Sequence, residues 1–181
     1  MRKKLELELK ASVIANFGGF VDRHEPARGA GLGSPDVEFL IRPGLGMLPV
    51  ELKAATEIDA TESTLYSAKS QGFRPSQIAW HREFAAAGGI AFGMLGVPIE
   101  RTSFTIGRKH YKSFHLFITY GYEIGGNECL WRPISRHTLH QELLKHVAYL
   151  ESDEGKRAWR SATPRREHVL PSGNLRKGSP S

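Results

Sequence analysis

Apolar side chains recur every four positions at the start of the chain, as in the apolar stripe of an amphipathic helix. Two later segments begin with a proline or with a capping-box pattern, both of which are typical of helix starts. A glycine pair follows the first and the second segment and is expected to end each helix. The stripe consists of Leu5, Leu9, Val13 and Phe17, and helices are predicted over about 4–17, 75–87 and 138–151.

Apolar and polar residues alternate between the first two helices, which predicts strands. Residues 36–41 and 47–53 have a period of two and are joined by a turn rich in Gly and Pro, so we predict a hairpin. Apolar, aromatic and β-branched runs predict further strands over 90–97, 103–106 and 114–120. The order of elements predicts an α/β domain in which a small mixed sheet is flanked by helices.

Length and composition are those of one globular domain. The chain has 181 residues, of which 40% are hydrophobic and 24% charged. No apolar run approaches the ~18 residues that span a bilayer, and the first residues lack the apolar stretch of a signal peptide. We therefore expect no membrane partner and a cytoplasmic location. The single cysteine, Cys129, excludes an internal disulfide and a cysteine-based zinc site.

The net charge of +6 is concentrated at the end of the chain. Residues 156–181 contain seven Lys or Arg and one acid, which leaves +6, so residues 1–155 balance to zero. The segment also contains several Pro and Gly and little apolar material. We therefore predict a single domain over 1–155 followed by a basic, weakly ordered tail. Such a tail suits the phosphates of a nucleic acid, and it equally suits a solubilising extension.

Three ionisable residues gather on the predicted hairpin. Glu51 and Lys53 are two positions apart on one strand and project from the same face. Pairing of the two strands would bring Asp36 close to Glu51. Two converging carboxylates suit Mg²⁺ or Mn²⁺, and the main-chain carbonyl of Leu52 is a further candidate ligand. Lys53 could then stabilise charge on a phosphate. The alternative is a solvated strand face with Asp36 capping a turn.

Pro35-Asp36, followed after a turn by Glu51-Leu52-Lys53, resembles the core of the PD-(D/E)xK nucleases. The likeness covers roughly residues 5–97 and is nearest to archaeal-type Holliday junction resolvases and VRR-type nucleases. The resemblance implies a restriction-endonuclease-like core over about 5–97 and a metal-dependent catalytic site. Residues 98–155 are then an elaboration for which the family offers no guide.

The same resemblance implies two further site residues. In these families the first helix carries an additional metal-site carboxylate, and Glu8 occupies the matching position, with Glu6 as the alternative. The segment that begins at Gln77 is similar to the glutamine-bearing helix of VRR-type nucleases, which implies that Gln77 joins the catalytic group. The implied metal ligands are therefore Glu8, Asp36, Glu51 and the carbonyl of Leu52, and the implied catalytic residues are Glu8, Asp36, Glu51, Lys53 and Gln77.

Several polar and cationic residues close to this site in the sequence are candidate nucleic-acid contacts. Some belong to the glycine-rich loop that leads into Asp36, where main-chain amides could also hold phosphates. Others lie at the start of the second helix, where helical spacing predicts that Ile78 and Phe84 face the core. The candidates are Arg23, His24, Arg28, Ser34, Arg74, His81 and Arg82.

Together these features predict an endonuclease that depends on Mg²⁺, with Mn²⁺ as a substitute, and cuts DNA. The small size and the basic tail fit a structure-selective or Holliday-junction-resolving enzyme of a phage or mobile element, which would act in the host cytoplasm. One alternative is a restriction-type, sequence-specific endonuclease in which residues 98–155 contact bases. Another is an inactive nucleic-acid-binding protein on the same scaffold. A homodimer is compatible with cleavage of both strands, because two cuts need two sites.

Overall fold

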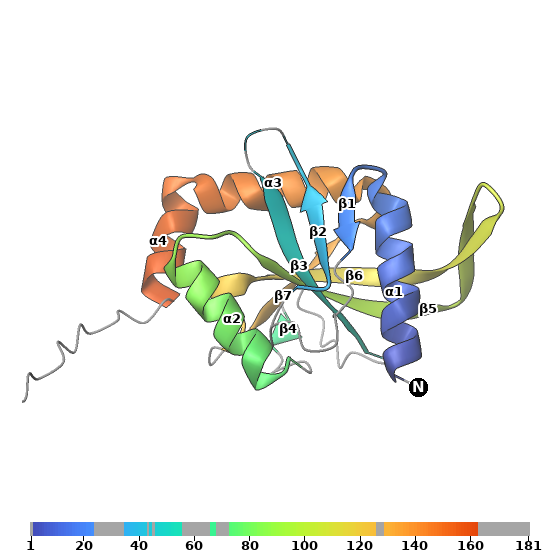
Figure 1. The fold of residues 1–181 in the computed structure, drawn as a ribbon, viewed down its shortest axis with the longest axis horizontal. Coiled ribbons are helices and arrows are strands. Elements are labelled where there is room, and N and C mark those ends of the chain that lie inside the picture. The colour runs from blue at the N-terminus through green and yellow to red at the C-terminus, as the bar shows by residue number, and fades with distance from the viewer. Residues whose placement is uncertain are drawn as a thin grey trace, which may run out of the picture.

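The chain folds into a mixed sheet flanked by helices (Figure 1). The computed structural model describes residues 2–23, 35–42, 44, 46–55, 66–67, 73–125 and 129–162. Within these ranges the strand order is β1-β2-β3-β5-β6-β7-β4. Strands β3 and β5 are parallel and the other neighbouring pairs are antiparallel. The strands are β1 (Val21–Arg23), β2 (Val37–Leu40), β3 (Met47–Ala54), β4 (Tyr66–Ser67), β5 (Phe92–Ile106), β6 (Lys109–Tyr120) and β7 (Leu130–Ile134).

Helices pack on both faces of the sheet (Figure 1). The larger apolar core joins the first and third helices to one face, and a smaller core around Trp131 lies on the other face, beside the second helix. Two short 3-10 turns, η1 (Gly121–Glu123) and η2 (Arg136–Thr138), flank β7. The helices are α1 (Arg2–Phe17), α2 (Pro75–Ala86), α3 (Leu139–Glu151) and α4 (Asp153–Ala162). The predicted α/β class and the three predicted helices are thus confirmed.

Strand β3 has an unusual face. Val50, Leu52 and Ala54 point into the larger core, as their alternation predicts. Glu51 and Lys53 point to the opposite face, toward α2, and both are buried there. Since charged side chains are rarely buried unless they are paired, this face of β3 is a candidate for chemistry.

Some predicted boundaries are wrong. The segments 90–97 and 103–106 were expected as separate strands, yet β5 runs through both, with a register shift between Pro98 and Ser103. Strand β6 begins at Lys109 and pairs with this extension. Strands β1, β4 and β7 were not predicted. None of the helices in the described part of the chain combines the length and the apolar character needed to cross a membrane.

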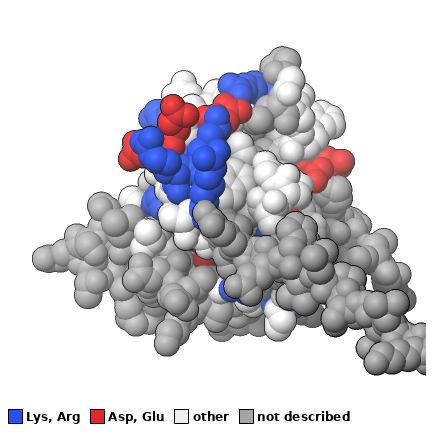
Figure 2. Space-filling model, turned by 90° about the vertical axis from the view of Figure 1, so that its left-hand side faces the viewer, with Lys and Arg blue, Asp and Glu red and all other residues white. Residues whose placement is uncertain are grey.

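The predicted tail begins too early at residue 156. Helix α4 continues to Ala162, where Trp159 stacks on Tyr122 with ring centroids 5.8 Å apart. Figure 2 views the side of the molecule that carries α4, where Lys and Arg side chains mix with Asp and Glu. Helix α4 itself has two acids in its first turn, which offset much of the charge of its three cations. Residues 163–181 lie outside the described ranges.

Candidate metal centre

Strand pairing brings Asp36 beside β3. The β2–β3 ladder places Val37 opposite Val50, so Asp36, which directly precedes β2, lies next to the following residues of β3. The main-chain N–H of Leu52 donates a hydrogen bond of 2.8 Å to Oδ2 of Asp36. The predicted approach of Asp36 to the Glu51-Leu52-Lys53 segment is therefore observed.

Glu51 is the centre of this group. Its side chain is 1% exposed, and its Oε1 accepts hydrogen bonds from Nζ of Lys53 and from Nε2 of Gln77. Its Oε2 is also buried and has no hydrogen-bond partner among the described residues. A buried carboxylate oxygen without a partner is costly, because it has lost water and gained nothing in exchange. This oxygen is therefore suited to a ligand that the protein itself does not supply.

The surroundings of Glu51 favour its protonated form in the metal-free protein. Burial is the main cause, and the neighbouring carboxyl of Asp36 adds to it, whereas Lys53 acts in the opposite direction. Together they raise the pKa of Glu51 from 4.5 to about 8. A cation bound between two carboxylates would reverse this balance, because it favours the charged form of both.

Gln77 and Lys53 hold Glu51 in place. The side-chain Oε1 of Gln77 accepts a hydrogen bond of 2.9 Å from the N–H of Arg74, which leaves its Nε2 directed at Glu51. Nζ of Lys53 lies 5.5 Å from the ring centroid of Phe73. Opposite Glu51 on β5 stands Gly93, where a Cβ would come within 2.8 Å of Phe73 and Thr119. Any larger residue at position 93 would therefore disturb the packing beside Glu51.

The carbonyl of Leu52 points to the side of β3 on which Asp36 lies. In a strand, the N–H and the C=O of one residue point to the same side. The N–H of Leu52 points to Asp36, and the β2–β3 ladder ends at Val50, so β2 does not occupy this carbonyl. The oxygen atoms of Asp36, Glu51 and Leu52 thus form a donor set of the kind that Mg²⁺ or Mn²⁺ prefers.

Glu8 does not join this group. It forms an ion pair with Lys112 of β6, with Nζ and Oε2 3.7 Å apart, and β5 lies between β6 and β3. The reason is helical geometry: Glu8 precedes Leu9, which faces the sheet, and lies on the flank of α1 directed to β6. Nor do three His, Cys, Asp or Glu residues gather as a metal-binding group within the described residues. The predicted role of Glu8 as a metal ligand is therefore not supported.

The predicted nucleic-acid contacts on α2 are partly wrong. The helix buries Gln77, His81 and Ala85 against the sheet, whereas Ile78 and Phe84 are half-buried. Ile78 packs against the smaller core, as predicted. His81 is 1% exposed and cannot touch a nucleic acid from this position. The guanidinium of Arg82 is exposed and donates a hydrogen bond to the carbonyl of Gly125.

The other predicted contacts are exposed or lie outside the described structure. Arg74 is exposed directly before α2, close to the centre, so its predicted contact with phosphate remains open. The backbone of Arg23 belongs to β1. His24, Arg28 and Ser34, together with the side chain of Arg23, lie outside the described residues.

His81 has a structural part in the centre. Burial, followed by the positive charge of Lys53, lowers its pKa from 6.5 to about 4, so the ring is neutral at neutral pH. Its ring packs edge-on against Trp80, with centroids 4.9 Å apart, and its Nδ1 is buried without a partner in the described structure. Because the His81 ring is neutral, the positive charge beside Glu51 comes from Lys53 and not from His81.

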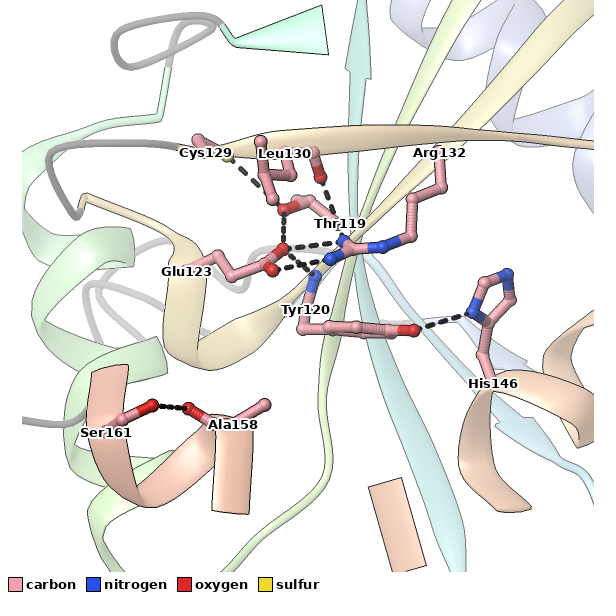
Figure 3. A network of polar contacts seen from close by, with 9 residues as sticks. All are labelled: Thr119, Tyr120, Glu123, Cys129, Leu130, Arg132, His146, Ala158 and Ser161. Carbon is pink, nitrogen blue, oxygen red and sulfur yellow. Dashed lines mark hydrogen bonds and ion pairs between the residues drawn. The ribbon is translucent and has the colours of Figure 1, made fainter. Parts of the chain in front are cut away.

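A second polar network, around Glu123 and Arg132, was not predicted from the sequence (Figure 3). The carboxylate of Glu123 accepts two hydrogen bonds from the guanidinium of Arg132, of 2.7 and 2.8 Å, and one of 3.0 Å from the hydroxyl of Thr119. The guanidinium of Arg132 lies 4.1 Å from the ring centroid of Tyr120. The hydroxyl of Tyr120 in turn lies 3.0 Å from Nδ1 of His146. This network ties β6, η1, β7 and α3 together and leaves the Glu123 carboxylate fully paired, so we assign it a structural role.

A cavity of about 690 Å³ lies at the far end of α2 from Gln77. It is lined by residues of the last turn of α2, the first residues of β3 and helix α4, including Phe84, Met47 and Trp159. None of the lining residues belongs to the Asp36–Glu51 group. The cavity is therefore separate from the candidate centre, which is identified by its two carboxylates.

The raised pKa of Glu51 predicts how the stability of the metal-free protein depends on pH. Between pH 4.5 and about 8 the folded state holds a proton that the unfolded state has released. The free energy of unfolding should therefore fall as pH rises through this window, by up to about 1.4 kcal/mol per pH unit. Urea unfolding of the wild type and of Glu51→Gln in EDTA should show this decline in the wild type alone.

The variant is needed because His81 acts in the opposite direction. Its lowered pKa contributes stability that is present above pH 6.5 and is lost as pH falls toward 4. Subtracting the Glu51→Gln curve removes this contribution and leaves that of Glu51. Identical pH dependence in the two proteins would mean that Glu51 is ionised in the folded, metal-free state.

Comparison of the chain with protein-family models, curated proteins and solved structures finds no match. The function is therefore inferred from the residues and their geometry.

Proposed function

We propose that the protein is a divalent-metal-dependent nuclease that hydrolyses phosphodiester bonds in DNA. The observation that carries the proposal is the buried, unpartnered Oε2 of Glu51, which lies beside Asp36 and next to the ammonium group of Lys53. Two carboxylates and one lysine in this arrangement can bind a cation and face a phosphate at the same time. The carboxylate of Glu123, by contrast, has both of its oxygens paired with Arg132.

The order of elements supports a restriction-endonuclease-like core of the PD-(D/E)xK type. Helix α1, strands β1 to β3, helix α2 and the first half of β5 all belong to the segment 5–97, for which the sequence resembles that superfamily. The crossover through α2 makes β3 and β5 parallel neighbours. It also places the first turn of α2 over β3, so that Gln77 reaches Glu51.

Each residue of the centre has a separate part in the proposed reaction. Asp36, Glu51 and the carbonyl of Leu52 would hold Mg²⁺, or Mn²⁺ in its place. The cation, when bound, supplies Lewis-acid polarisation of the phosphodiester. Gln77 fixes one oxygen of Glu51 and leaves the other for the ligand. Lys53, whose ammonium group is held beside Glu51, supplies a positive charge that stabilises the negative charge developing on the phosphate.

A nucleic acid is the substrate that suits the charge of the chain. The net charge is +6 at neutral pH, and cations attract a polyanion through its phosphates. DNA rather than RNA follows from the resemblance to DNA-cleaving families, as does a preference for junctions or other branched structures. We include in this proposal that the protein is an enzyme of a phage or mobile element.

The test is cleavage by the purified protein of four substrates side by side. Supercoiled plasmid, linear duplex, single strands and a four-way junction are incubated with Mg²⁺, with Mn²⁺ and with EDTA. We expect cleavage that requires the metal and is fastest on the junction. Binding to DNA without cleavage under any metal condition would contradict the proposal and would favour an inactive scaffold instead.

A further inference from the structure

A two-stranded arm extends from the sheet. Beyond the register shift at Pro98, β5 and β6 pair with no other described strand than each other, from Ser103 opposite Lys112 to Ile106 opposite Lys109. Gly107, with φ of +60°, and Arg108 form the two-residue turn at its tip, a place where positive φ favours glycine. Figure 1 shows this hairpin, residues 99–112, projecting past α1 and away from the helices.

The arm carries an excess of positive charge. Residues 99–112 contain four Lys or Arg and one acid, Glu100, which leaves +3. Residues 1–155 as a whole balance to zero, so the part of them outside the arm, residues 1–98 and 113–155, has a net charge of −3. The side chains of Arg101, Arg108 and Lys109 are exposed, and none has a hydrogen bond or ion pair to another described residue. This charge is therefore available to a partner.

Aromatic packing gives the arm one fixed face. Phe104 and Tyr111 stack with centroids 5.3 Å apart, and the guanidinium of Arg136 lies 5.9 Å from the ring of Phe104. The opposite face carries Ser103, Thr105 and His110, all exposed, with the Thr105 hydroxyl 3.0 Å from Nδ1 of His110. Lys112 is on this face too, but its Nζ pairs with Glu8 of α1. Hydroxyl, imidazole and ammonium groups can hydrogen-bond to phosphates and to base edges.

The arm leaves the sheet at the end that holds the candidate centre. Because β3 and β5 are parallel and Lys53 is opposite Leu95, the arm begins about four residues beyond the level of Lys53. At about 3.3 Å per residue this is roughly 13 Å along the strand. A DNA duplex with one phosphate at Asp36 and Glu51 would therefore continue toward the arm.

We propose that the β5–β6 arm, residues 99–112, is a contact surface for duplex DNA. The inference rests on the proposed nuclease function and adds a substrate-binding element to it. A two-stranded ribbon fits the major groove of B-DNA, and the cations at its tip can contact the flanking phosphates. A second copy of this chain that docks arm to arm is less suited, since two surfaces of equal positive charge repel one another.

The test compares charge reversals of equal size. Lys109→Glu and Arg108→Glu change the tip, and Lys145→Glu is the matched control on α3, where Lys145 is exposed and pairs with Glu142 at 2.9 Å. Binding to a fluorescein-labelled 30-base-pair duplex, and to the single strand, is measured by anisotropy in EDTA over a salt series. Thermal unfolding checks that each variant is folded.

We expect each tip variant to bind the duplex about tenfold or more weakly, with a salt slope reduced by about one, and to lose less on the single strand. The control should stay within about twofold of the wild type. Equal behaviour of tip and control variants would overturn the assignment, as would a loss seen only on single strands. A change in molar mass of the tip variants with unchanged DNA binding would instead make the arm a dimer contact.

Cleavage in Mg²⁺ is measured on the same proteins and separates the two proposals. Wild-type cleavage with no binding defect in the tip variants would reject the arm and keep the nuclease. A binding defect confined to the tip variants, with no cleavage by the wild type, would keep the arm and reject the nuclease.

Discussion

Glu51→Gln and Asp36→Asn should each lower Mg²⁺-dependent cleavage by roughly 10³-fold or more. Either change removes a charged oxygen from the proposed metal centre but keeps the size of the side chain. Loss of a metal ligand removes several kcal/mol of transition-state stabilisation, and about 1.4 kcal/mol corresponds to a tenfold change in rate. DNA binding in EDTA should remain within a few-fold of the wild type, since the cationic surfaces are unchanged.

Glu8→Gln is the matched control for these two variants. It makes the same chemical change on a carboxylate that pairs with Lys112 on β6, away from the centre. We expect cleavage close to that of the wild type. If Glu8→Gln lost as much activity as Glu51→Gln, then α1 would contribute to the centre when metal is bound. Wild-type rates for both Glu51→Gln and Asp36→Asn would place the chemistry elsewhere.

Lys53→Ala should slow turnover by roughly 10²-fold or more while leaving metal binding largely intact. The ammonium group contacts Oε1 of Glu51 rather than Oε2, so its removal leaves the proposed ligand oxygen in place. Turnover at saturating Mg²⁺ and saturating DNA measures the effect. The metal dependence of thermal unfolding, measured on the same protein, shows whether the cation still binds.

A pH series separates the two ways in which Lys53 can act. Lys53 lowers the pKa of Glu51, so one way in which its loss can act is to raise that pKa further and to leave more of Glu51 protonated near pH 7. If this were the only effect, cleavage by Lys53→Ala would recover at pH 9. A defect that persists at pH 9 with metal bound identifies Lys53 as the residue that stabilises charge on the phosphate.

Local patterns were sufficient to predict the part of the fold that carries the centre. The four-residue period predicted α1, and the two-residue period predicted β2 and β3 with Glu51 and Lys53 on one face. The hairpin then required Asp36 to lie near Glu51, which the bond from Leu52 to Asp36 confirms. Gln77 was suggested only by resemblance to VRR-type nucleases, and its contact with Glu51 is observed.

Features that depend on distant partners were not predictable in this way. The role of Glu8 depends on which strand lies under its flank of α1, and strand order is not encoded in helical period. Strand β7 is short and gains its ladder from β6. The polar run after Pro98 indicated the end of a strand, whereas pairing with β6 continues β5 to Ile106. The basic composition of residues 156–162 led us to predict a weakly ordered tail there, although these residues belong to α4. Trp159 of α4 packs on Tyr122 and so attaches the helix to the domain.

The position of a bound cation tests the central claim most directly. Crystals of the protein soaked in Mn²⁺ would reveal the ion by its anomalous scattering. We expect one peak about 2.1 Å from Oε2 of Glu51 and from a carboxylate oxygen of Asp36, with the Leu52 carbonyl within coordination distance. A crystal that holds Mn²⁺ at other sites, with Glu51 still bonded to Lys53 and Gln77 and no peak beside its Oε2, would contradict the account.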